Sequence, residues 1–179
     1  MEELLIENYF NYETSKVKVK VLKDHSEVTF LGNVYGPFIK GKEIELPRAL
    51  ARILASEGIT EYPYPQITFD DIRKKHHQEK LAKHELKKLE EDFYLQAKDL
   101  IFLAERKIIN ENPKEIKQLI NEICLVRLEK MMKGILYVED FNKITQLLTY
   151  EERYLFSSLR EIIRTWLDDV LNNAILRKL

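Results

Sequence analysis

Three histidines and two glutamates crowd one stretch of the chain and are the residues best suited to bind a metal ion. They are His76, His77, His84, Glu79 and Glu85. Metal-binding histidines of the metalloprotease type are spaced i, i+4 on one helix and are completed by a third ligand elsewhere. No two of these histidines have that spacing, and no cluster that could supply a third ligand follows them in the chain. We therefore expect solvated polar side chains on a charged helix and no metal site.

Motifs of the common catalytic and nucleotide-binding sites do not occur in this sequence. There is no GxGxxG, no P-loop and no nucleophile elbow. Ser157 and Ser158 lie in a predicted helix beside apolar residues and without a nearby base. Glu151 and Glu152 are better explained by helix capping and the helix dipole than by acid–base chemistry. The sequence predicts neither enzymatic activity nor a bound cofactor.

A run of lysines in the same charged stretch could form a basic surface for DNA. The first of them are Lys74, Lys75, Lys80 and Lys83, within residues 73–88. Glutamates are interleaved with them, so i, i+4 pairing would dilute the patch. The formal net charge of the chain is -1, which gives no bulk attraction to nucleic acid or membrane. A helical DNA-binding regulator that uses residues 73–88 is the alternative function.

A small β-rich module is predicted for the first third of the chain. From Lys16, valines alternate with lysines, which is the period of a half-buried strand. Residues 27–31 read as a second strand after a turn, so we expect these two strands to form a hairpin. A further short strand near residues 42–46 and a helix from Pro47 to about Glu57 complete the module.

Helices are predicted from Thr68 onward. Thr68 and Asp71 form a capping-box pattern at the start of a helical stretch that runs to about residue 110, with a break expected near residues 90–92. Residues 113–132 carry the strongest helix signal, and a loop is expected around residues 133–140 before a short helix at 141–148. A second capping box, Thr149 with Glu152, starts the last helix.

These helices carry more apolar surface than a lone chain of this length needs. Leu125 and Leu128 lie off the main apolar face of the 113–132 helix, and the last helix has a wide stripe that includes Phe156 and Trp166. Large contiguous apolar surface in a soluble protein is usually an interface. We predict that these four residues contact other subunits, although Trp166 fits the chain's own core equally well.

The expected fold class is α+β, with a small N-terminal β-rich module followed by a larger α-helical bundle. Its predicted parts are residues 1–61, a Pro-rich linker at 62–67 and a helical domain at 68–179. Cys124 is the single cysteine, which suits a reducing cytoplasm. No signal peptide or apolar run of ~20 residues is present, so a cytoplasmic protein is expected.

Residues 32–54 resemble the β-rich module of subunits of the GINS DNA replication complex. The matching positions are Gly36, Pro37, Phe38, Gly41, Leu46, Pro47, Leu50, Ala51 and Leu54. A second resemblance begins at Tyr94 and runs through the 113–132 helix, where the matching positions are Glu115, Ile116, Leu119, Ile120, Arg127 and Lys130. Leu148 and Thr149 give a third. The order of these parts is similar to that of the class that carries the β module first, the two/three type, in a compact archaeal version.

The resemblance implies a non-enzymatic scaffold of the replisome, with a B-type module at residues 1–61 and an A-type domain at 68–179. Sister GINS subunits would complete a four-chain complex, for example a heterotetramer. The implied partners of this helicase accessory factor are the MCM helicase and a RecJ/Cdc-forty-five-like protein, and direct DNA contact is left open. The protein would then be nucleoid-associated, or nuclear in a eukaryote. From the residues themselves, Arg127 is predicted to be a partly buried ion-pairing residue.

Overall fold

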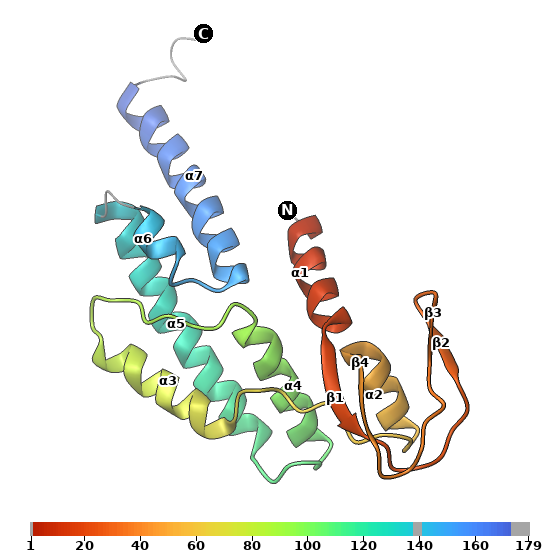
Figure 1. The fold of residues 1–179 in the computed structure, drawn as a ribbon. Coiled ribbons are helices and arrows are strands. Elements are labelled where there is room, and N and C mark those ends of the chain that lie inside the picture. The colour runs from red at the N-terminus through yellow and green to blue at the C-terminus, as the bar shows by residue number, and fades with distance from the viewer. Residues whose placement is uncertain (1, 138–140, 173–179) are drawn as a thin grey trace. The chain divides into compact units, whose positions relative to one another are not determined.

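The computed structural model of the protein describes residues 2–137 and 141–172. The chain divides into two compact units, Met1–Gln66 and Ile67–Leu179, here the N-terminal and C-terminal units (Figure 1). Each unit has a buried apolar core of its own. Short strands in the first unit and a helical bundle in the second make this an α+β fold, which confirms the predicted class.

The N-terminal unit contains two small antiparallel sheets and two helices. In chain order its elements are α1 (Glu2–Thr14), β1 (Lys16–Lys20), β2 (Val28–Phe30), β3 (Asn33–Tyr35), β4 (Glu43–Pro47) and α2 (Arg48–Ser56). The expected hairpin between the first two strands is wrong, because β1 pairs with β4 and β2 pairs with β3. Leu31 and Gly32 both have positive φ, which closes a tight turn and gives β2 its nearest partner in β3.

Two of the three lysines of β1 lie opposite glutamates of β4. Lys18 lies opposite Glu45, and Lys20 lies opposite Glu43. Opposite charges directly across an antiparallel pair stabilise the sheet modestly. The other face of β1 points inward, where Val19 joins a core that the remaining strands and α2 complete. Its buried members are Val19, Val21, Phe38, Leu46, Leu50, Ala51, Leu54 and Ile59.

Replacing Gly36 by alanine should destabilise the N-terminal unit by about 1–3 kcal/mol. The φ of Gly36 is +111°, and a Cβ there would lie 3.0 Å from the Phe38 ring and 3.1 Å from the Cα of Glu27. Gly41 is the matched control, since its φ of +86° carries similar strain but a Cβ would meet nothing within 4 Å. Urea denaturation followed by the amide NMR signals of this unit measures both variants. Equal losses would show that crowding at Gly36 contributes nothing.

The C-terminal unit is a bundle of helices. Its elements are α3 (Phe69–Leu81), α4 (Phe93–Glu105), α5 (Pro113–Tyr137), α6 (Phe141–Thr145) and α7 (Tyr150–Asn172). Thr68 caps α3 in the predicted capping box with Asp71, and the Asn112 side chain accepts a hydrogen bond from the Lys114 amide at 3.0 Å at the start of α5. No helix within residues 2–137 and 141–172 is long and apolar enough to cross a lipid bilayer.

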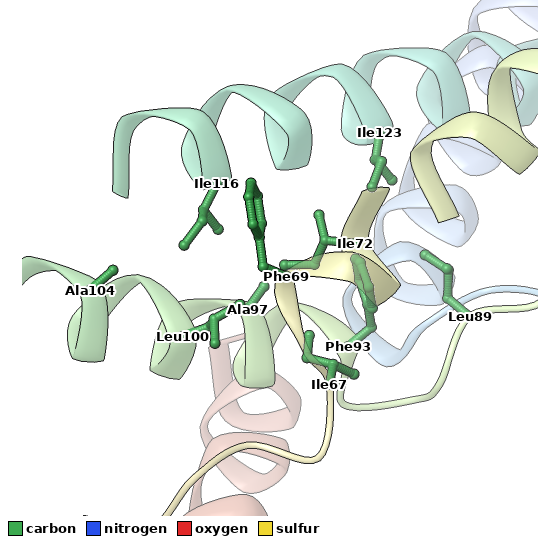
Figure 2. Close-up of a cluster of buried hydrophobic side chains, with 10 residues drawn as sticks. All are labelled: Ile67, Phe69, Ile72, Leu89, Phe93, Ala97, Leu100, Ala104, Ile116 and Ile123. Carbon is green, nitrogen blue, oxygen red and sulfur yellow. The ribbon is translucent and has the colours of Figure 1, made fainter. Parts of the chain in front are cut away.

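Two apolar clusters hold the bundle together. The larger cluster fills the space between α3, α4 and α5 (Figure 2). Its buried residues are Ile67, Phe69, Ile72, Leu89, Phe93, Ala97, Leu100, Ala104, Ile116 and Ile123. The smaller cluster joins α5 to the start of α7 through Leu86, Met131, Leu148 and Phe156. Both clusters include a residue from the segment between α3 and α4, so that segment is fixed to the bundle.

Helix boundaries depart from the prediction in three places. α3 ends at Leu81, and residues 82–92 are not helical, so the break includes the expected position near residues 90–92 but begins earlier, at residue 82. α5 continues to Tyr137, through most of the expected loop at 133–140, whose last three residues lie outside the described range. α6 ends at Thr145 and is shorter than the expected helix at 141–148. The first of these differences follows from a buried ion network described next.

Candidate functional site

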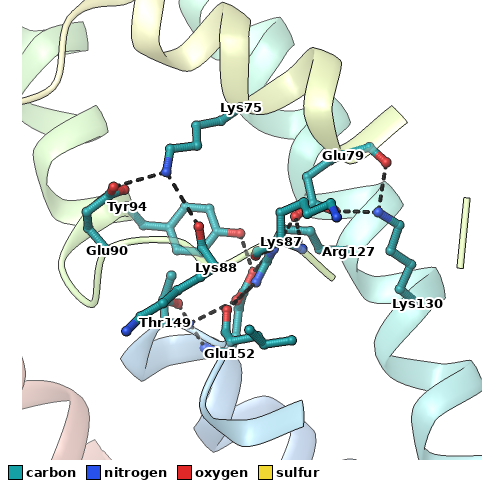
Figure 3. Close-up of polar contacts among 11 residues, drawn as sticks. Lys75, Glu79, Lys87, Lys88, Glu90, Tyr94, Arg127, Lys130, Thr149 and Glu152 are labelled. Atoms are coloured by element: carbon teal, nitrogen blue, oxygen red, sulfur yellow. Dashed lines mark hydrogen bonds and ion pairs between the residues drawn. The ribbon is translucent and has the colours of Figure 1, made fainter. Parts of the chain in front are cut away.

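A buried arginine lies at the centre of the C-terminal unit. The side chain of Arg127 on α5 is 0% exposed. It donates to both oxygens of Glu152, at 2.6 and 2.7 Å, and to Glu79 (Figure 3). It also donates to the backbone oxygens of Lys87 at 2.7 Å and Leu147 at 3.0 Å. These bonds join α5 to α3, to the 82–92 segment and to the start of α7.

Two further side chains complete this network. Lys130 forms an ion pair with Glu79 and donates to its backbone oxygen at 2.7 Å. The hydroxyl of Tyr94 donates to Glu152 at 2.6 Å. Burial, followed by the nearby charge of Glu152, raises the pKa of Tyr94 above its ordinary value. Burial opposes the charge of Arg127, yet its hydrogen bonds to Glu152 keep its pKa above the usual range.

The same carboxylate caps the last helix. The amide of Thr149 donates to Glu152 Oε2 at 3.0 Å, and the amide of Glu152 donates to the Thr149 hydroxyl at 3.3 Å. The predicted second capping box is therefore confirmed. Because Glu152 also binds Arg127, the cap fixes where α7 leaves the bundle. The charges of the network are balanced and its groups are bonded to one another, so the arrangement is one for holding helices.

The network also explains the early end of α3. Glu79 is 1% exposed, and its Oε1 accepts a hydrogen bond from the amide of Lys87 at 3.0 Å. The 82–92 segment therefore forms backbone hydrogen bonds to the side chains of Glu79 and Arg127 in place of helical hydrogen bonds. The sequence reading placed Glu79 on a solvated face, which is wrong. No local signal distinguishes it from the other acidic residues of this charged helix, because its charged partners, Arg127 and Lys130, are 48 and 51 residues away along the chain.

The histidine and lysine residues of α3 are mostly paired with acids. His76 Nε2 and Lys80 Nζ each lie 2.7 Å from Glu122 Oε2 on α5. Lys75 pairs with Glu90 at 3.0 Å. Within the described residues, no group of three or more His, Cys, Asp or Glu side chains is arranged to hold a metal ion. Since the helix stops at Leu81, residues 73–88 do not form the single basic helix that the alternative function requires.

Acid should weaken the contact that Glu122 makes between α3 and α5. Hydrogen bonds from Lys80, Gln118 and His76 lower the pKa of Glu122 from 4.5 to about 2. A depressed pKa in the folded state means that this stabilisation is complete above pH 4.5 and is lost as the pH falls toward 2. The thermal midpoint of the Glu122→Gln variant should consequently fall less steeply with pH in that window than that of the wild type. Equal slopes would contradict the expectation, and Glu57→Gln, at an exposed site, serves as the control.

An apolar groove lies between α4, α5 and the first turns of α7. Its volume is about 430 Å³. The lining residues are Tyr94, Ala97, Lys98, Ile101, Ile120, Cys124, Leu125, Leu128, Met131, Glu151, Glu152 and Leu155. Leu125 is 58% exposed and Leu155 is 40% exposed. Two large leucine side chains are thus left open to solvent at a hollow in the bundle.

The second half of α7 has an uncovered apolar stripe. Trp166 is 61% exposed, Ile162 64% and Val170 55%. Of the four residues predicted to contact other subunits, Leu125 and Trp166 have exposed side chains and Leu128 keeps part of its surface uncovered. Phe156 does not. It is 1% exposed and packs with Met131 and Leu148, so its assignment to the interface is wrong because the chain's own core covers it.

The residues that carried the family resemblance occupy structural positions. Phe38, Leu46 and Leu50 are buried in the core of the N-terminal unit, and Pro47 precedes α2. Gly36 and Gly41 both have positive φ. In the C-terminal unit, Ile116 is 0% exposed, whereas Glu115 makes a surface ion pair with Arg73 at 2.8 Å, and Arg127 is fully buried rather than partly buried.

The comparison with known families identifies the helical unit. The model of the GINS complex protein helical bundle domain matches residues 66–171, which is more than half of the chain. No curated protein was found to match the chain. The matched range contains the Arg127 network, the apolar groove and nearly all of α7. This chain belongs to the GINS family of DNA replication complex subunits.

Proposed function

We propose that the chain is a non-enzymatic scaffold subunit of the GINS complex, in the class that carries its β-rich module first. It assembles with sister subunits into a four-chain complex and links the MCM replicative helicase to a RecJ/Cdc-forty-five-like protein. The observation that carries this proposal is the apolar surface on the helical unit of a GINS family member. That surface consists of the groove beside α5 and the uncovered stripe of α7.

The extent and position of this apolar surface favour an assembled complex over a monomer. Obligate interfaces bury about 2,000 Å² or more and resemble a domain core cut in half. The stripe of α7 extends over several helical turns, from Ile162 at 64% exposed to Leu171 at 75% exposed. An isolated chain would leave this surface in water, where contiguous apolar patches favour aggregation.

The Arg127 network supports a preformed binding surface. It fixes α5 and the start of α7 to each other through Glu152, so the groove walls are held before a partner arrives. A preorganised surface reduces the entropy lost on binding. In this proposal the residues that bind partners are Leu125, Leu128 and Trp166, and the family-motif residues act in folding.

The N-terminal unit is proposed to be a docking module. We assign residues 1–61 to a B-type module, 62–67 to a linker and 68–179 to the A-type helical domain. The sheets of the N-terminal unit are short and two-stranded. A module of this size is stabilised by docking on larger partners.

A single fluorine label tests the assembly directly. Trp166 is the only tryptophan of the chain, so growth on 5-fluorotryptophan gives one ¹⁹F resonance. Addition of an unlabelled sister GINS subunit should shift and broaden this resonance, and native mass spectrometry should give the mass of a four-chain complex. The assembled complex should then retain MCM on an affinity column. An unchanged resonance together with a monomeric mass would refute the proposal.

A further inference from the structure

Two arginines of α7 make no ion pair in the part of the chain that the structure describes. Arg160 and Arg164 lie one turn apart on one face of the helix, and both are exposed. The Cζ atom of Arg160 lies 3.7 Å from the centre of the Phe141 ring, which holds the guanidinium group in one orientation. By contrast, Arg153 on the same helix pairs with Glu91 at 2.6 Å. Arg160 and Arg164 therefore keep donors for a ligand.

Both arginines line a small polar pocket between α6 and α7. Its volume is about 310 Å³, and its other lining residues are Phe141, Asn142, Thr145, Phe156, Ser157 and Glu161. Glu161 is the one acid among these described residues and pairs with neither arginine, so the net charge of the lining is positive. The amide of Asn142 and the hydroxyl of Ser157 are exposed neutral donors. This set of donors suits a carboxylate or phosphate group.

An apolar pocket adjoins the polar one and shares the same two arginines. α5, α6 and α7 meet at this end of the bundle (Figure 1). The volume of the apolar pocket is about 300 Å³, and the residues that it adds are Ile135, Leu136, Ile163 and Leu167. Leu136 is 53% exposed and Leu167 is 39% exposed. A ligand that fills both pockets carries an oxyanion next to an apolar group.

The surrounding charges favour an acidic peptide over a nucleic acid. Asp168 is exposed and lies four residues after Arg164 on the same face of α7, and Glu161 lies within the polar pocket. A nucleic-acid strand carries a charge at every nucleotide, so a strand that extends past the arginines meets these acids. A short peptide places one carboxylate at the arginines, where each guanidinium fork can hold it through two parallel hydrogen bonds.

We propose that Arg160 and Arg164 bind a short segment of another protein in which acidic and apolar residues alternate. A carboxylate of that segment lies between the two guanidinium groups, and a neighbouring apolar side chain enters the pocket beside Leu136. Clusters of arginines recognise acidic motifs in this way in many complexes. This inference goes beyond the proposed function, since it requires no sister subunit.

Fluorescence anisotropy with a labelled peptide tests the inference. The probe is fluorescein-labelled Gly-Leu-Asp-Glu-Leu-Asp-Leu-Gly, titrated with the full chain at physiological ionic strength. The Kd of the Arg160→Gln/Arg164→Gln chain should be about tenfold higher than that of the wild type. Arg106→Gln is the matched control and should leave Kd unchanged, because Arg106 is also exposed and lies over the Phe102 ring. Absence of binding by the wild type, or equal Kd values for the wild type and the double variant, would overturn the inference.

Changes to the peptide and to the apolar pocket test the two halves of the site separately. Replacing the acids of the probe by Asn and Gln should abolish binding, and replacing its leucines by Ser should raise Kd about fivefold. Leu136→Asn in the chain should weaken binding of the original probe to a similar degree. Circular dichroism and thermal unfolding establish that each variant is folded. Full affinity for the serine peptide and for the Leu136→Asn chain would overturn the proposed site.

Two further outcomes would assign the arginines to a different occupant. If oligothymidylate binds more tightly than the probe and the double variant loses that binding, the occupant is a nucleic acid. If the full chain associates with itself and the double variant does not, the occupant is a second copy. Either result would overturn the inference. Failure of a sister subunit to bind would overturn the proposed function alone, because the peptide test uses this chain by itself.

Discussion

Replacing Arg127 with methionine should lower the free energy of unfolding of the C-terminal unit by about 3–5 kcal/mol. The loss comes from the carboxylates of Glu79 and Glu152, which would stay buried without their main partner. Both are at most 5% exposed and neither can reach water without opening the bundle. Methionine keeps most of the side-chain volume, so the effect reports charge and hydrogen bonding more than a cavity. Urea denaturation followed by far-ultraviolet circular dichroism measures it.

Two further variants make the Arg127 result specific. Arg106→Met removes an exposed arginine that lies over the Phe102 ring, and it should cost less than about 1 kcal/mol. Replacing Glu152 by glutamine in the Arg127→Met background should recover part of the loss, because the carboxylate left without its cation is then neutral, whereas Glu79 keeps its ion pair with Lys130. A loss below about 1 kcal/mol for Arg127→Met alone would show that the network adds specificity and little stability.

Local signals in the sequence predicted much of the secondary structure. The alternation of valine and lysine predicted β1, and the two capping boxes placed the starts of α3 and α7. The helix signal of residues 113–132 placed the start of α5 at Pro113. Each of these features depends on residues within about four positions of one another, so one stretch of sequence contains all of the relevant physical chemistry. The α+β class followed from the same local patterns.

Contacts between residues far apart in the chain could not be predicted from local sequence patterns. The partner of β1 is β4, more than twenty residues away, and nothing in the alternation of β1 selects it over β2. The end of α3 depends on Arg127, since the 82–92 segment leaves the helix to bond with it. In the candidate site, the excess apolar surface was evident from the wide stripes, but periodicity could not tell which residues the chain itself covers. Phe156 is buried and Trp166 is exposed on the same helix.

An aspartate at position 123 and one at position 125 should have opposite consequences, although the two residues lie on the same helix. Ile123 is 0% exposed within the α3, α4 and α5 cluster, so Ile123→Asp buries a charge with no partner and should cost more than about 4 kcal/mol. Leu125 is 58% exposed. Leu125→Asp should therefore change the unfolding free energy of the chain by less than about 1 kcal/mol and leave its helical circular dichroism intact.

Assembly should respond in the reverse manner to Leu125→Asp. An aspartate placed at the mouth of the groove would be buried by an incoming apolar helix, so affinity for the sister subunit should fall at least tenfold in calorimetry while the chain alone stays folded. Lys114→Asp, at an exposed position near the start of α5, is the matched control and should bind as the wild type does. If Leu125→Asp unfolds the isolated chain as Ile123→Asp does, Leu125 belongs to the chain's own core. If it neither unfolds the chain nor weakens binding, the partner lies elsewhere, and the stripe around Trp166 becomes the surface that assembles the complex.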